Sequence, residues 1–164
     1  MNQTVYFTTR RCITGANEYR YFNGVKPLGE ASAFVMRLSS ISIRGTAITM
    51  QCEQDMDRTV FPGARNVVIN AHTGEAVASS VWLETGCHAL YLDNVKVDVV
   101  VKDGIYHFSR QGTPLAVMAR SPRGKSSPHT DDQWESEFVM MAPQPLSDRL
   151  ALLMLAFPLI QVAP

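Results

Sequence analysis

The feature that most constrains this chain is a run of eleven uncharged residues near its end, from Leu150 to Ile160. The run is apolar in every direction, so a helix formed by it has to be enclosed on all sides. It is shorter than the ~20 apolar residues that cross a bilayer, and it contains Pro158. We expect no transmembrane span. Because the preceding chain reads as short strands and tight turns, we expect a sheet that wraps around a terminal helix.

The bulk properties describe one globular domain. The chain has 164 residues, of which 46% are hydrophobic and 18% are charged. Basic and acidic residues number 15 each, and a net charge of zero argues against general nucleic-acid binding, which needs a basic footprint. Cys12, Cys52 and Cys87 show no paired spacing. Isolated thiols and an N-terminus without an apolar leader indicate a cytoplasmic protein.

Alternation and turn residues indicate several short strands. Residues 67–69 and 75–83 flank a polar turn that ends in Gly74, and residues 97–101 and 105–109 flank Asp103-Gly104. Asp-Gly between apolar runs is a strong signal for a hairpin. Residues 114–119 and 134–141 continue the strand pattern, whereas residues 120–133 read as a long exposed loop.

Glycines and prolines break residues 1–30 repeatedly, at Gly15, Gly24, Pro27 and Gly29. We therefore keep two interpretations of this segment: an N-terminal arm, or the first strand or strands of the sheet.

The end of the chain carries a helix signature. Ser147 is a suitable N-cap, and Asp148 suits the positive end of a helix dipole. We predict a helix over residues 148–157. Pro158 disfavours helical geometry at the residue before it, so residues 159–162 are expected to form a last short strand.

Three features resemble the tubby C-terminal-like superfamily, in particular the small bacterial LURP-one-related proteins, and the phospholipid scramblases belong to the same superfamily. They are the strand-turn-strand units at residues 69–77 and 108–116, the strand at residues 135–141, and the acid-led apolar helix at residues 148–156. The resemblance implies that residues 31–164 form a mainly β domain, a closed antiparallel β-barrel of about twelve strands around a central hydrophobic C-terminal helix. Pro158 and the long loop at residues 120–133 depart from the family pattern.

Recognisable catalytic and cofactor motifs are missing from the sequence. It contains no GxSxG, HExxH or dinucleotide fingerprint, and Gly124-Lys125-Ser126 lacks the first glycine of a phosphate-binding loop. Adjacent side chains of a strand point to opposite faces, so Cys87 and His88 are not expected to share a metal. Glu135 and Glu137 are expected on the outward face of their strand, opposite Phe138. We predict no catalytic residues, no cofactor and no metal.

Basic residues supply the candidate site. Arg120, Arg123 and Lys125 lie with several serines in one loop, and Lys102 and Arg110 precede them. Such groups bind phosphate by charge and hydrogen bonding, and tubby-type domains bind phosphoinositide head groups. The predicted function is a non-catalytic binding or regulatory module that contacts anionic phospholipid, peripheral at the membrane. Two alternatives stay open: a barrel that binds a protein partner and has no lipid role, and a small-molecule-binding barrel or an enzyme without a recognisable motif.

Overall fold

The computed structural model describes residues 3–13, 16–34, 37–43, 49–54, 63–70, 72–92, 94–121 and 134–162, without the side chains of residues 13, 34, 37–43 and 49–54. The strands are β1 Thr4–Ile13, β2 Ala16–Asn23, β3 Lys26–Phe34, β4 Arg37–Ile43, β5 Thr49–Gln54, β6 Arg65–Asn70, β7 Ala76–Glu84, β8 Cys87–Leu92, β9 Val95–Lys102, β10 Ile105–Arg110, β11 Thr113–Arg120 and β12 Glu135–Ala142. The helices are α1 Asp148–Leu155 and α2 Phe157–Ile160. The prediction of a mainly β fold is confirmed.

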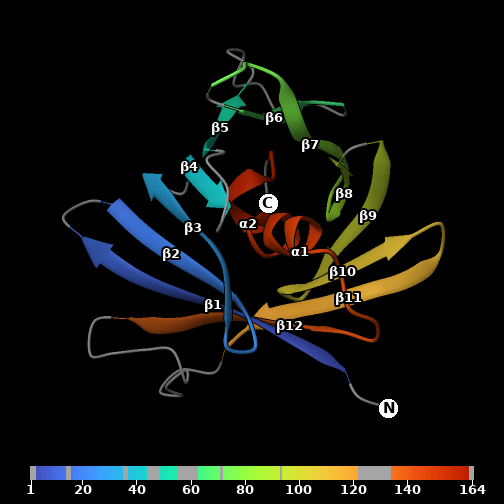
Figure 1. The fold of residues 1–164 in the computed structure, drawn as a ribbon. Coiled ribbons are helices and arrows are strands. Elements are labelled where there is room, and N and C mark those ends of the chain that lie inside the picture. Colours follow the sequence, from blue (N-terminus) through green and yellow to red (C-terminus); the bar gives the residue numbers. More distant parts are fainter. Residues whose placement is uncertain are drawn as a thin grey trace.

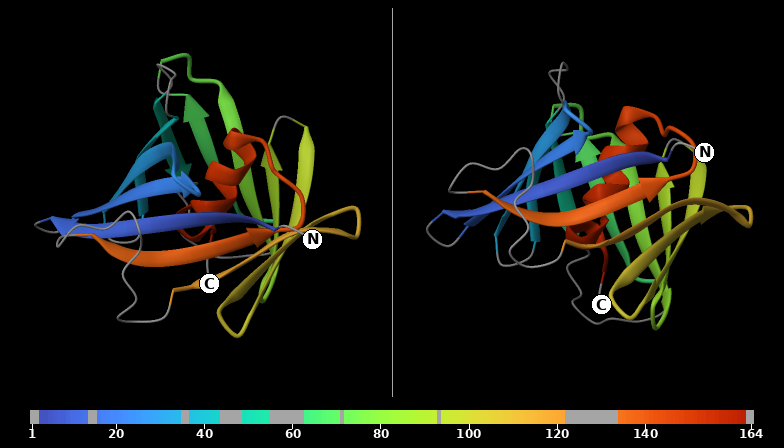
Figure 2. Two further views of the ribbon diagram at one scale, coloured as in Figure 1. Left: turned by 60° about the horizontal axis from the view of Figure 1, so that its bottom comes forward. Right: turned by 90° about the horizontal axis from the view of Figure 1, so that it is seen from below.

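All strand pairs are antiparallel, and each strand pairs with its neighbours in the sequence (Figure 1). β1 also pairs with β12, from Thr4 opposite Ala142 to Arg10 opposite Glu135. The succession of pairs therefore returns to its starting strand. β4 and β5 are joined through two residue pairs, Ile41 with Met50 and Ser42 with Thr49. Figures 1 and 2 show the strands curving around both helices.

Three strands of the sheet come from the first part of the chain, β1 Thr4–Ile13, β2 Ala16–Asn23 and β3 Lys26–Phe34. They correspond to the interpretation of this segment as first strands of the sheet. β2 pairs with β1 on one side and with β3 on the other. The register of β2 and β3 shifts between Tyr21 and Phe22, which lie opposite Gly29 and Pro27. Pro27 and Gly29, two of the residues that seemed to break the segment, thus lie at an irregularity of the ladder, which glycine and proline tolerate.

The hairpin turns follow the local sequence closely. Asp103 and Gly104 both have positive φ, 54° and 77°, as do Gln111 and Gly112, 50° and 79°. Two consecutive residues with positive φ match the right-handed twist of antiparallel strands. These turns connect β9 to β10 and β10 to β11, as the turn residues predicted.

The terminal helix begins where the sequence predicts. The Ser147 hydroxyl accepts a hydrogen bond from the Leu150 backbone N–H. Leu152, Leu153 and Leu155 are at most 1% exposed, which confirms their expected burial. α1 ends at Leu155, with Ala156 as its C-cap. The prediction of a last short strand over residues 159–162 is wrong, because the second helix, α2, occupies Phe157–Ile160.

Pro158 is accommodated because it lies in the first turn of α2, where its missing N–H has no intrahelical acceptor to lose. The side-chain amide of Asn66 on β6 donates to the carbonyl oxygens of Ile160 and Gln161 at 2.9 and 3.2 Å. These hydrogen bonds join the end of α2 to the sheet.

Candidate functional site

Two of the predicted basic residues, Lys102 and Arg110, lie apart from each other. Lys102 ends β9 and Arg110 ends β10, and because these strands are antiparallel the two residues lie at opposite ends of their hairpin. Arg123 and Lys125 lie outside the described residues. Of the five predicted basic residues, the structure therefore describes only Lys102, Arg110 and Arg120.

Arg120 is bound to a carboxylate. It ends β11 opposite Phe138 of β12, with its guanidinium carbon 4.9 Å from the centre of the Phe138 ring. Its Nη1 atom donates to Glu137 Oε1 at 2.5 Å. This ion pair reduces the charge that Arg120 can offer to another anion.

Glu137 departs from the expected outward position. The β1–β12 register pairs Thr8 with Phe138 and Thr9 with Ser136, so Glu137 is the extra residue of a bulge. Its side chain is 11% exposed, and Arg10 Nε lies 3.5 Å from its second carboxylate oxygen. Together with Tyr19 and Leu159 it lines a small cavity of about 20 Å³ beside the helices. Glu135 is 78% exposed, as predicted. The bulge reverses the alternation on which the prediction for Glu137 depended.

The pKa of the neighbouring Tyr19 is raised in this environment. Burial, and then the negative charge of Glu137, raise the pKa of Tyr19 above 10.0. Tyr19 therefore stays protonated in the physiological range. Arg10, Tyr19, Arg120 and Glu137 form a compact group on β1, β2, β11 and β12, which we call the Glu137 cluster.

A second group of charges surrounds Trp134, just before β12. The guanidinium carbons of Arg11 and Arg20 lie 4.7 and 4.1 Å from the Trp134 ring centre, within cation–π range. Trp134 is only 5% exposed. Arg11 also donates through Nε and Nη2 to Glu18 Oε2, at 3.1 and 2.9 Å.

Arg20 differs from the other three arginines of this region. Among the described residues, no carboxylate lies within 4.0 Å of its guanidinium, whereas Arg10, Arg11 and Arg120 each have at least one. Glu30 is its cross-strand partner on β3. Stacking on Trp134 holds the Arg20 side chain in place without neutralising its charge.

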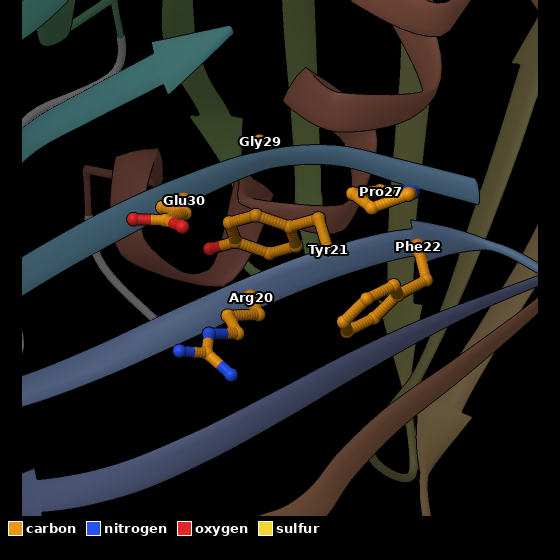
Figure 3. A pocket seen from close by; sticks show the side chains of 6 residues that line it. All are labelled: Arg20, Tyr21, Phe22, Pro27, Gly29 and Glu30. Carbon is orange, nitrogen blue, oxygen red and sulfur yellow. The ribbon is translucent and has the colours of Figure 1, made fainter. Parts of the chain in front are cut away.

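Two hollows meet at this arginine, and we call them together the β2–β3 groove. One has a volume of about 300 Å³ and is lined by Arg20, Tyr21, Phe22, Pro27, Gly29 and Glu30. The other, of about 270 Å³, is lined by Arg11, Glu18, Tyr19, Arg20, Glu30, Ala31, Ser32 and Trp134. Figure 3 shows Arg20 and Phe22 extending to the same side of β2, with Tyr21 on the other side. Arg20 and Glu30 thus lie at the junction of a polar half and an apolar half.

Sequence reasoning missed this groove because its residues come from the segment treated as an arm. Arg11, Glu18, Arg20 and Glu30 are spread over β1, β2 and β3. A signal was present in the alternation of Glu18, Arg20 and Phe22 against Tyr19 and Tyr21. That alternation indicates a shared surface only when the register of β1, β2 and β3 is known.

His88 is a buried titratable group away from the groove. It is 1% exposed and lies edge-on to Phe157, with ring centres 5.3 Å apart. Neither ring nitrogen has a hydrogen-bond partner among the described residues. Burial lowers the pKa of His88 below 6.5. In the part of the chain that the structure describes, no three His, Cys, Asp or Glu residues gather as metal ligands.

The fold and the groove define an antiparallel β protein with apolar C-terminal helices and an open, amphipathic surface site. Comparison with known proteins gives no match: no family model, no curated protein and no solved structure is significantly similar to this chain. Among the described helices, neither is long and apolar enough to cross a membrane.

Proposed function

We propose that the protein is a non-catalytic binding or regulatory module of the tubby C-terminal-like class, a closed β-barrel around a central helix, and that it contacts anionic phospholipid head groups. The cyclic order of strand pairs and the burial of α1 support this architecture. The resemblance in the strand-turn-strand units and the terminal helix supports the class. In this proposal the protein is cytoplasmic and associates peripherally with membranes.

The observation that carries the function is the position of Arg20 in the β2–β3 groove. A guanidinium without a carboxylate partner is a good donor to a phosphate. The neighbouring half of the groove contains Phe22 and Pro27, which suit the hydrocarbon next to a lipid phosphate. Glu30, on the opposite strand, can accept hydrogen bonds from head-group hydroxyls. Hydroxyl-bearing head groups such as phosphoinositides fit this pair of charges.

Sedimentation with vesicles tests the proposal. At low salt, the parent protein should partition onto phosphatidylcholine vesicles that contain a phosphoinositide, and less onto phosphatidylcholine alone. Arg20→Gln should weaken this binding about fivefold, since one basic residue near an anionic membrane contributes ~1 kcal/mol. Arg65→Gln removes an exposed arginine of β6, outside the groove, and should leave partitioning nearly unchanged.

Two results would contradict the proposal that the β2–β3 groove binds anionic lipid. Equal partitioning of the parent onto both vesicle types would remove the lipid function. If Arg20→Gln binds as the parent does while the triple substitution of Arg120, Arg123 and Lys125 by alanine abolishes binding, the basic loop is the site instead.

The alternative of a protein-partner-binding barrel is favoured by a different observation. Val100, Ile105, Val117 and Met141 are exposed large hydrophobic residues on four consecutive strands, β9 to β12. Exposed apolar patches of this kind mark interaction surfaces.

A further inference from the structure

Four charged side chains line the polar half of the β2–β3 groove, and they form one closed pair and one open pair. Arg11 donates through Nε and Nη2 to Glu18 Oε2, at 3.1 and 2.9 Å, so the charges of these two residues cancel. Arg20 and Glu30 are cross-strand partners. Among the described residues, neither takes part in an ion pair within 4.0 Å. The groove therefore offers a ligand one unpaired guanidinium and one unpaired carboxylate.

The strand register places these groups in two neighbouring rows. One row consists of Arg11 on β1, Glu18 on β2 and Ser32 on β3. The other row contains Arg20 and Glu30, two residues further along β2 and two residues earlier on β3, and therefore on the same face. Figure 3 shows Arg20 and Glu30 extending from these neighbouring strands.

The two halves of the groove set the orientation of a lipid in the proposed function. Phe22 and Pro27 line the apolar half, which takes the hydrocarbon next to the diester phosphate. Arg20 lines both halves and takes the phosphate itself. The rest of the head group then extends into the polar half, of about 270 Å³, where Glu30 and Ser32 lie. Of the described basic side chains that line this half, only Arg20 is not paired with a carboxylate.

We propose that Glu30 selects the head group: the groove takes phosphatidylinositol, whose single phosphate is the diester, and excludes inositol rings that carry further phosphates. This inference rests on the proposed lipid function and specifies the lipid. Ring hydroxyls donate hydrogen bonds to the Glu30 carboxylate and to the Ser32 hydroxyl.

A phosphate on the ring meets the opposite situation. A phosphate monoester carries about 1.5 to 2 negative charges near neutral pH. Arg20 already binds the diester, and Arg11 is already bound to Glu18. The ring phosphate therefore faces the negative charge of Glu30, and repulsion of the wrong partner is a common source of specificity.

The exposure of Glu30 limits the strength of this selection. Solvent and salt screen an exposed carboxylate. We therefore expect a preference of about fivefold, the order of one solvent-exposed charge interaction. The chain has zero net charge, so it exerts no long-range preference for the more highly charged lipid.

A head group with an amine would also satisfy the charge of Glu30. An inositol ring fits better, because its hydroxyls point to several sides and reach Glu30 and Ser32 together. A short amino alcohol fills little of a hollow of about 270 Å³.

Vesicle sedimentation at low salt tests the selection. Phosphatidylcholine vesicles carry phosphatidylinositol, phosphatidylinositol bisphosphate or phosphatidylserine, each adjusted to the same total charge. The parent should bind the phosphatidylinositol vesicles about fivefold more tightly than the bisphosphate vesicles. Glu30→Gln keeps the shape of the side chain and removes its charge, so it should bind the bisphosphate vesicles about fivefold better than the parent does and lose the preference.

Glu75→Gln is the matched control. It removes the same charge from an exposed residue just before β7, outside the groove, and it should keep the parental preference. Unchanged thermal unfolding by circular dichroism verifies that both variants fold as the parent does.

The outcomes separate this inference from the lipid function on which it rests. Absence of binding to every anionic vesicle refutes the lipid function itself. Parental binding that is equal or stronger with the bisphosphate, or strongest with phosphatidylserine, overturns the selection while the lipid function stands. A Glu30→Gln protein that keeps the parental preference overturns the role of Glu30.

Discussion

At the scale of single residues, one extra amino acid in a strand decides where a carboxylate lies. Strict alternation would place Glu135 and Glu137 together on the outer face. The bulge of β12 turns Glu137 toward the helices, where Arg10 and Arg120 surround it. The two glutamates, two positions apart, therefore provide a matched pair of a covered and an exposed carboxylate.

Glu137→Gln should lower the free energy of unfolding by about 1–2 kcal/mol. The amide keeps the shape of the side chain but loses the charge that pairs with two arginines, one of them well exposed and partly screened by solvent. Urea unfolding at neutral pH measures the change. Glu135→Gln, at a 78% exposed site, should change stability by less than about 0.5 kcal/mol. Equal effects of the two substitutions would show that burial of Glu137 contributes nothing.

The lowered pKa of His88 leads us to predict that the stability of the protein depends on pH. Because burial lowers its pKa in the folded protein, the unfolded chain binds a proton more readily. The contribution of neutral His88 is complete above its unfolded pKa of about 6.5 and is lost as the pH falls below that value.

The measurement is urea unfolding at about pH 7.5 and about pH 5, on either side of the histidine range. His88→Leu should lose less stability on acidification than the parent. His72→Gln removes an exposed histidine in a turn and should behave as the parent does. If acid destabilises His88→Leu and the parent equally, His88 does not carry the pH dependence.

At the scale of elements, α1 is stabilised by enclosure more than by helix propensity. An isolated helix of eight residues is too short to be stable in water. Its residues Ala151 to Leu155 are at most 1% exposed. α1 ends at Leu155 and α2 begins at Phe157, so Pro158 lies in the first turn of a new helix and the apolar run continues as α2.

Leu152→Asp should prevent folding. An unpaired carboxylate at a fully buried position of α1 costs more than about 4 kcal/mol, a large part of the stability of a domain this size. Soluble yield and far-ultraviolet circular dichroism report the loss. Leu83→Asp, at a 43% exposed position of β7, should fold normally. A Leu152→Asp protein that melts within a few degrees of the parent would contradict enclosure of the helix.

At the scale of the whole molecule, pairing of β1 with β12 brings the two ends of the sheet together. The same pairing aligns Val5 with Met141 on the outer face and sets Arg10 beside Glu135 and Glu137.

Local sequence determined those features that depend on neighbouring residues. Asp103-Gly104 specified a hairpin because few residue pairs tolerate positive φ twice in succession. Ser147 and the run after Asp148 specified where the helix begins and that it is buried. The tertiary structure alone decided the place of strands β1 to β3, the bulge at Glu137 and the β2–β3 groove. Each of these depends on the register between segments far apart in the chain, and a shift of one residue turns every side chain of a strand to the opposite face.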